Sequence, residues 1–428
     1  MGSAFPRFWA GQTLSALGSQ VTVFALPLLA TSTVGAGAMD LGLLGAAQMA
    51  PPLLFGLPAG SWVDRLPRRA TLICADLGRA LLLLPLMVLG WQGALRLWHL
   101  YAVAFLSGCL TVAATTACQA FLPALVEPQR LVEANARLGA SQSLARLLGP
   151  AMAGVLVAWM TAPLALGVDV LSFLVSAALL AWLRVGESGP RVTRPSRGLW
   201  RDTAEGLGFL WRQPLLGPLA TCAGLFNLFG GMILGVYFLY VTRELGMEPR
   251  QVGSLGAVFG LGALVGALLA GRLTARLGVG PALVGALALG AVADLLIPAA
   301  GLHEAAALPL LVAAQLLIGL TNPLFQSNVL ALYQALTPEH LRGRVGAALR
   351  FLVNALLPVG SLLGGVLGEA LGLRQSILLA ALGTGLCALG LLPTPLRGLR
   401  SLPAPVEVTP PTPPADLPGG TPLARRGG

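Results

Sequence analysis

One acid and three arginines crowd together directly after a long apolar run. Residues 41–63 carry no charged side chain, and the segment GSWVDRLPRR spans the point where this run ends. The residues of interest in it are Gly60, Asp64, Arg65, Arg68 and Arg69. A carboxylate here can pair with an arginine or cap a facing helix, and a glycine lets a second backbone approach closely. The pattern favours a reversible contact between two parts of the protein over a cluster of anchoring charges.

Ionisable side chains inside apolar segments are costly, so each is a functional candidate. Asp76 and Arg79 are three residues apart, which places them on one face of a helix, where they can pair and extend toward the helix end. This spacing favours a structural role. Arg146 lies deeper in another apolar segment, with Gln142 four residues before it, and could meet an anionic group of a bound small molecule. Structural pairing is an equal alternative for Arg146.

Uncharged amides in apolar segments complete the set of candidate site residues. They are Gln12, Gln48, Asn227, Gln315, Gln326 and Asn328. Such amides can contact a bound small molecule or hold helices together. The three histidines lack metal-ligand spacing and the chain has no phosphate-binding Walker loop, so we expect no enzyme, no metal site and no cofactor.

These residues belong to a chain made for a lipid environment. It has 428 residues, of which 56% are hydrophobic and only 10% are charged, with a mean hydropathy of +0.79. A helix that crosses a bilayer needs about 20 apolar residues. The sequence therefore predicts an all-α membrane protein with twelve spans, near 8–33, 40–62, 71–92, 97–121, 138–161, 164–184, 215–242, 250–271, 279–300, 306–335, 345–370 and 374–393.

The placement of arginine predicts the orientation of these spans. All 27 basic residues are arginines, and with the N-terminus inside most of them fall in cytoplasmic loops, as the positive-inside rule requires. Both termini are then cytoplasmic. The net charge of +10 reflects this topology, and we do not expect a nucleic-acid partner.

The chain also repeats itself. The segment EPQRLVEANARL from Glu127 aligns with PEHLRGRVGAAL from Pro338, about 210 residues later. The repeat predicts two six-helix bundles, over 1–184 and 215–393. The polar composition of 185–214 predicts a cytoplasmic linker with a short surface helix, and the Pro-rich composition of 394–428 predicts a disordered cytoplasmic tail. Duplicated bundles favour a transporter that works by alternating access. A channel, receptor or scaffold is the alternative.

Several segments resemble the major facilitator superfamily. GSWVDRLPRR resembles its GxxxDRxGRR loop signature, with Pro67 in place of a glycine, and FWAGQTLSALGSQVTVFALPLL from Phe8 looks like the bacterial exporter branch of enterobactin and macrolide efflux proteins. The likeness covers nearly all of residues 7–393. It implies two pseudo-symmetric six-helix bundles in which Asp64 locks the cytoplasmic side against residues 342–346, with its neighbours as gating residues.

The run GPAMAG, with Gly149, Pro150 and Gly154, is similar to the helix 5 motif of exporters in this superfamily. Ordinary use of Gly and Pro in membrane helices is the alternative. The chain lacks the helix 4 arginine of many drug antiporters, and Ser19 stands where some relatives carry an acid, and both departures weaken the case for a proton pathway like theirs. The resemblance places Asp169 and Asp294 at the periphery of the bundles, and neither is our preferred proton carrier.

The resemblance implies a secondary active transporter in a bacterial cytoplasmic membrane. We expect a monomer that is surrounded by lipid and uses protons to export small amphipathic molecules such as drugs or siderophores. An importer, symporter or facilitator of a small metabolite is the alternative within transport. A lipid scramblase or a non-transporting receptor is the alternative outside it.

Overall fold

The computed structural model describes residues 4–63, 65–183, 199–338 and 341–401, and throughout these ranges the regular structure is helical, with no strand. Twelve of the helices are long and apolar enough to cross a membrane. The predicted all-α membrane fold is confirmed.

The first half of the chain forms six long helices. They are α1 Ala4–Thr33, α2 Ala38–Val63, α3 Arg68–Trp91, α4 Leu97–Leu125, α5 Leu131–Met160 and α6 Ala162–Ala181. Helix α5 begins well before the predicted start near residue 138. Its first turns carry Glu133 and Arg137, which pair at 2.8 Å one turn apart with both side chains about half exposed, so these charges do not end the helix.

The second half forms six more. They are α8 Leu216–Leu239, α9 Pro249–Leu277, α10 Val279–Ala299, α11 Glu304–Leu336, α12 Arg342–Leu371 and α13 Leu373–Leu391. Thr161 between α5 and α6 has φ 77°, and Gly372 between α12 and α13 has φ 99°. Each residue directly follows the fifth long helix of its half, and both combine a positive φ with an extended ψ, 157° at Thr161 and 153° at Gly372. This backbone conformation favours glycine and is costly for the β-branched threonine.

Helix α7, Leu199–Arg212, joins the two halves and packs against the start of α12. A Cβ atom at Gly206 would lie 2.5 Å from the carbonyl oxygen of Arg344, so glycine permits this close approach. The Arg344 guanidinium also pairs with Glu205 at 2.8 Å. The segment in which the sequence predicts a short surface helix is therefore attached to the second half.

The predicted disorder of the tail is wrong for its first residues. Residues Pro395–Gly398 form a short 3₁₀ helix, and Leu396 is fully buried. The backbone N–H of Gly280 donates a 2.9 Å hydrogen bond to the carbonyl of Leu399, which attaches this turn to the start of α10. The burial of Leu396 and this backbone hydrogen bond order the start of a segment whose Pro-rich composition predicts disorder. The remainder of the predicted tail, residues 402–428, lies outside the described residues.

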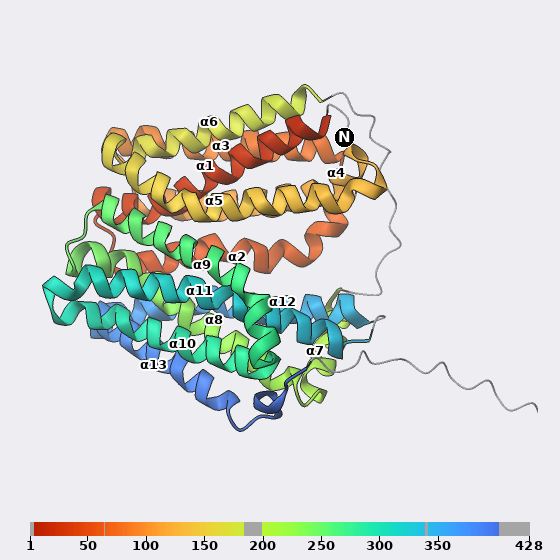
Figure 1. The fold of residues 1–428 in the computed structure, drawn as a ribbon. Coiled ribbons are helices and arrows are strands. Elements are labelled where there is room, and N and C mark those ends of the chain that lie inside the picture. The colour runs from red at the N-terminus through yellow and green to blue at the C-terminus, as the bar shows by residue number, and fades with distance from the viewer. Residues whose placement is uncertain (1–3, 64, 184–198, 339–340, 402–428) are drawn as a thin grey trace, which may run out of the picture.

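The two halves approach each other at one end and diverge toward the other. In Figure 1 the ribbons of α1, α3, α5 and α6 lie above those of α8 to α13, and the distance between them grows toward the N-terminus and α7. Helices α2, α5, α9 and α12 carry most of the contact between the halves. We call the end away from the N-terminus, where α2 begins and α5 ends, the closed end.

Candidate functional site

Glycine pairs bring the backbones of the two halves together at the closed end. A Cβ atom at Gly154 of α5 would lie 2.6 Å from the Cα of Gly253 on α9, and one at Gly256 would lie 2.3 Å from the Cβ of Pro150. Real Cβ atoms do not approach this closely. Two residues of the predicted exporter motif therefore lie at the contact between halves, whereas Gly149 is held against Gln20 of α1 within the first half.

A second contact joins α2 to α12. The hydroxyl of Ser361 donates a 3.0 Å hydrogen bond to the carbonyl of Gly42. A Cβ atom at Gly42 would lie 3.0 Å from the Cα of Gly365, so these helices also touch backbone to backbone. Phe24 of α1 and Phe238 of α8 add an edge-to-face contact with ring centroids 5.4 Å apart. The closed end is thus held by small residues, one hydrogen bond and an aromatic pair.

Removal of the Ser361 hydroxyl should weaken the closed end modestly. An interhelical hydrogen bond in a membrane contributes about 0.6 kcal/mol, so we expect Ser361→Ala to change the ratio of the two conformations about threefold. Ser376→Ala is the matched control, because the Ser376 hydroxyl donates at the same 3.0 Å to Gly364 within the second half. Distance distributions between spin labels on the two halves measure the ratio. An equal effect of both variants would contradict the assignment.

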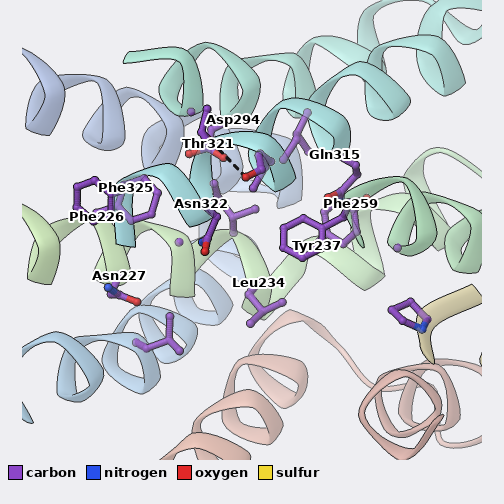
Figure 2. Close-up of a pocket in the computed structure, with 18 of the residues that line it drawn as sticks. Phe226, Asn227, Leu234, Tyr237, Phe259, Asp294, Gln315, Thr321, Asn322 and Phe325 are labelled. Carbon is purple, nitrogen blue, oxygen red and sulfur yellow. Dashed lines mark hydrogen bonds between the residues drawn. The ribbon is translucent and has the colours of Figure 1, made fainter. Parts of the chain in front are cut away.

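A cavity of about 480 Å³ lies next to this contact. The first half contributes Gln20, Val23, Phe24 and Pro150 to its wall, and α8 to α12 contribute the rest. Figure 2 shows Phe226 and Phe325 stacked near one side of the cavity, with Tyr237 and Phe259 together at another. The first pair has ring centroids 5.6 Å apart. The cavity is mainly apolar and aromatic, which suits the apolar part of a small molecule.

Polar groups interrupt this apolar wall at a few places. The Gln315 amide donates a 2.7 Å hydrogen bond to the Tyr237 hydroxyl, which leaves the hydroxyl hydrogen for another acceptor. The Asn227 amide donates to Ala223 O at 2.9 Å, so its own carbonyl can still accept. Asn227 and Gln315 are the predicted amides that line this cavity, and Asn322 lines it as well.

Among the described residues that line the cavity, one carries a carboxyl group. Asp294 of α10 is 8% exposed, and no arginine in the described part of the chain forms an ion pair with it. Figure 2 shows it beside Thr321, at the wall formed by α10 and α11. The expectation that Asp294 lies at the periphery is therefore wrong. An ionisable residue in an apolar segment was the available signal, but the direction of its side chain was not visible in the sequence.

A second set of buried charges lies wholly within the first half. Asp76 and Arg79 form an ion pair, and the guanidinium stacks 4.2 Å from the ring centroid of Phe173 on α6. Both charged residues are buried, so they do not extend to the helix end as expected. Asp169 of α6 accepts hydrogen bonds from Thr22 of α1 and from Ser172. These groups bind α1, α3 and α6 to one another and do not line the cavity.

A protein-family model described as Transmembrane secretion effector matches residues 2–413. The chain belongs to this family of the major facilitator superfamily. Among its curated relatives, the multidrug efflux pump Tap of Mycobacterium bovis is 30% identical over 94% of this chain and 95% of the pump. Macrolide efflux protein A of Streptococcus pyogenes is 25% identical over 93% of this chain and 97% of that protein. The suspected resemblance is confirmed.

Solved structures of transporters share the fold of this chain. A bacterial homolog of the human lysosomal transporter Spinster, inward-facing and unoccupied, superposes with a TM-score of 0.68 at 15% identity over 90% of this chain and 95% of that one. A bacterial homologue of the iron transporter ferroportin in its inward-facing state superposes with a TM-score of 0.69 at 17% identity. The match covers 90% of this chain and 98% of that one. The chain is a multi-pass bacterial membrane transporter and not an enzyme.

The residues of the loop signature in this transporter are only partly described. Asp64 lies outside the described residues, and Gly60 lies in a part of α2 where only the backbone is described. Arg65 is exposed and Arg68 is half-buried at the start of α3. The Arg69 guanidinium donates to the carbonyls of Leu180, at 2.9 Å, and of Ala181. Arg69 therefore also stabilises the C-terminus of α6, as a cation at a helix C-terminus does.

The remaining predicted site residues lie away from the cavity. Arg146, Gln142 and Gln326 are exposed, and Gln12 is half-buried, and none of these four lines it. Gln48 lines a smaller pocket between α1, α2 and α8. Asn328 is buried and exchanges hydrogen bonds with Thr274 of α9, so it joins two helices. Groups of three or more metal-ligating side chains are absent from the described ranges.

Proposed function

We propose that this transporter exports small amphipathic molecules from the cytoplasm by alternating access. The observation that carries the proposal is a cavity of about 480 Å³ with aromatic walls, lined by both halves and next to their contact at the closed end. Relatives named as multidrug and macrolide efflux proteins, which match almost the whole chain, support the same direction and kind of cargo.

The distribution of arginine supports a cytoplasmic N-terminus. The closed end then faces the outside of the cell, and the described conformation is inward-facing. Cargo enters the cavity between the halves from the cytoplasm. Closure at the cytoplasmic end and separation of the glycine contacts at the other end would release the cargo outside.

A reversible latch at the cytoplasmic end is part of this proposal. Asp64 would pair with the start of α12, around residues 342–346, when the cytoplasmic ends of the halves approach each other, with Arg65 and Arg68 beside it. Attachment of the start of α12 to α7 through Arg344 and Glu205 supports the idea that the linker moves with this region. Asp64→Asn should shift the population toward the inward-facing state.

Protons are the proposed coupling ion, and the absence of a phosphate-binding loop from the sequence argues against direct use of ATP. The test uses proteoliposomes sorted for orientation, a set of fluorescent drug-like compounds and an imposed pH gradient. Accumulation on the side opposite the cytoplasmic face, abolished by an uncoupler, is the expected result. Flux that ignores the gradient would indicate a facilitator or scramblase, and accumulation in the reverse direction an importer.

A further inference from the structure

The cavity contains a single ionisable carboxyl group and no basic side chain among the described residues that line it. Asp294 supplies the carboxyl group, from the face of α10 that carries Leu287, Gly290 and Ile297 along the same wall. The other wall of this region is α11, where Thr321 and Phe325 lie one helical turn apart. The acid therefore has an apolar and aromatic environment in which charge is expensive.

The hydrogen bonds around Asp294 leave its negative charge poorly compensated. Thr384 of α13 is the side chain within hydrogen-bonding reach of the carboxyl group. Its hydroxyl also lies 3.0 Å from the carbonyl of Ala380. A hydroxyl has one hydrogen, so Thr384 can donate to the carboxyl group or to this carbonyl but not fully to both, and one neutral donor compensates a carboxylate only in part. An ionised Asp294 would need another positive partner, and the described residues of the chain supply none.

The surroundings of Asp294 fit an organic cation better than a metal ion. Calcium and magnesium require about six oxygen ligands, and they keep bound water where the protein supplies fewer. The described residues contain no cluster of three metal-ligating side chains. Aromatic faces, in contrast, attract a cationic group, and the Phe226 and Phe325 rings lie in the same cavity with centroids 5.6 Å apart. A volume of about 480 Å³ holds a drug-sized molecule.

We propose that the Asp294 carboxylate binds the positively charged group of an amphipathic organic cation while its apolar part contacts the aromatic side chains of the cavity. This inference rests on the proposed export function, for which it names the chemical class of cargo. Neutral and anionic molecules of the same shape would lack the positive charge that compensates an ionised Asp294.

The test compares two probes of the same shape and opposite charge. Tetraphenylphosphonium is a cation and tetraphenylborate is an anion, and their equilibrium affinities are measured by radioligand binding to the full-length protein in lipid nanodiscs. Loss of one partner of a buried charge pair costs at least about 2 kcal/mol, or about thirtyfold in affinity. We expect Asp294→Asn to weaken the cation at least about thirtyfold without weakening the anion, and Asp294→Glu to retain most cation binding.

Two control variants locate the effect. Asp169→Asn removes another buried acid that does not line the cavity, and it should leave both affinities unchanged. Phe325→Ala removes an aromatic wall and should weaken both probes. Equal cation affinity in wild type and Asp294→Asn, or an equal loss of both probes, would overturn the inference. If the asparagine variant does not fold, the two probes are compared on the wild-type protein alone. Equal affinity for the anion and the cation would then overturn the inference.

These measurements distinguish failure of the cation site from failure of the proposed export function. Outward, uncoupler-sensitive transport of other compounds with no effect of Asp294 on cation binding would refute the cation site and leave export standing. Selective cation binding that depends on Asp294, in a protein that transports nothing outward, would support the site and refute export.

Discussion

Gly154→Leu should open the closed end and nearly abolish transport. The new side chain would begin 2.6 Å from the Cα of Gly253 and 3.0 Å from the carbonyl oxygen of Pro249. These are backbone atoms that cannot rotate away. Overpacking of this kind costs about 1–3 kcal/mol, and a bias of that size changes the ratio of two conformations by roughly 5- to 150-fold. The cost falls only on the conformation in which α5 and α9 touch.

Spin labels at Gln92 and Leu302, in a background without native cysteines, would report the distance between the halves at the closed end. Both positions are exposed, in the turns after α3 and α10. We expect a longer distance in Gly154→Leu and a corresponding loss of transport. Gly139→Leu is the matched control, because a Cβ atom at this glycine of the same helix meets nothing within 4 Å. An unchanged distance in Gly154→Leu would show that this glycine contact does not hold the halves together.

Arg79→Gln should strongly destabilise the first half of the protein. The side chains of Arg79 and Asp76 are 8% and 2% exposed, so removal of the guanidinium leaves a buried carboxylate without its partner. Breaking a buried ion pair on one side lowers the free energy of unfolding by about 3–5 kcal/mol. Unfolding by a titration with sodium dodecyl sulfate, followed by circular dichroism, measures this loss.

The exposed ion pair of α5 provides the comparison for Arg79. Arg137 and Glu133 also lie one turn apart on one helix, but their side chains are 46% and 52% exposed. Arg137→Gln should cost less than about 1 kcal/mol, because water replaces the lost partner. The double variant Asp76→Asn with Arg79→Gln should recover much of the stability. If the double variant is no more stable than Arg79→Gln, the loss comes from packing against Phe173 and not from an unpaired charge.

The sequence by itself determined the class of protein, the twelve spans and the duplication. A membrane helix needs about 20 consecutive apolar residues and has to satisfy its backbone groups within itself, so its existence is a local property. The exporter motif was also a local signal, because small residues such as Gly154 indicate close helix contact in lipid. The pairing of Asp76 with Arg79 followed from a spacing of three residues.

Tertiary structure alone decided which side chains of different helices meet. Leu396 was placed in a disordered tail, and its burial depends on a contact with α10 more than a hundred residues away in the chain. Asp294 was assigned to the periphery and lines the cavity. In water, the alternation of polar and apolar residues reveals which face of a helix is buried. In lipid, the outer face of a helix is as apolar as the core, so the sequence pattern does not distinguish the buried face from the lipid-facing one. Only the packing of the helices shows where the side chain of a buried acid points.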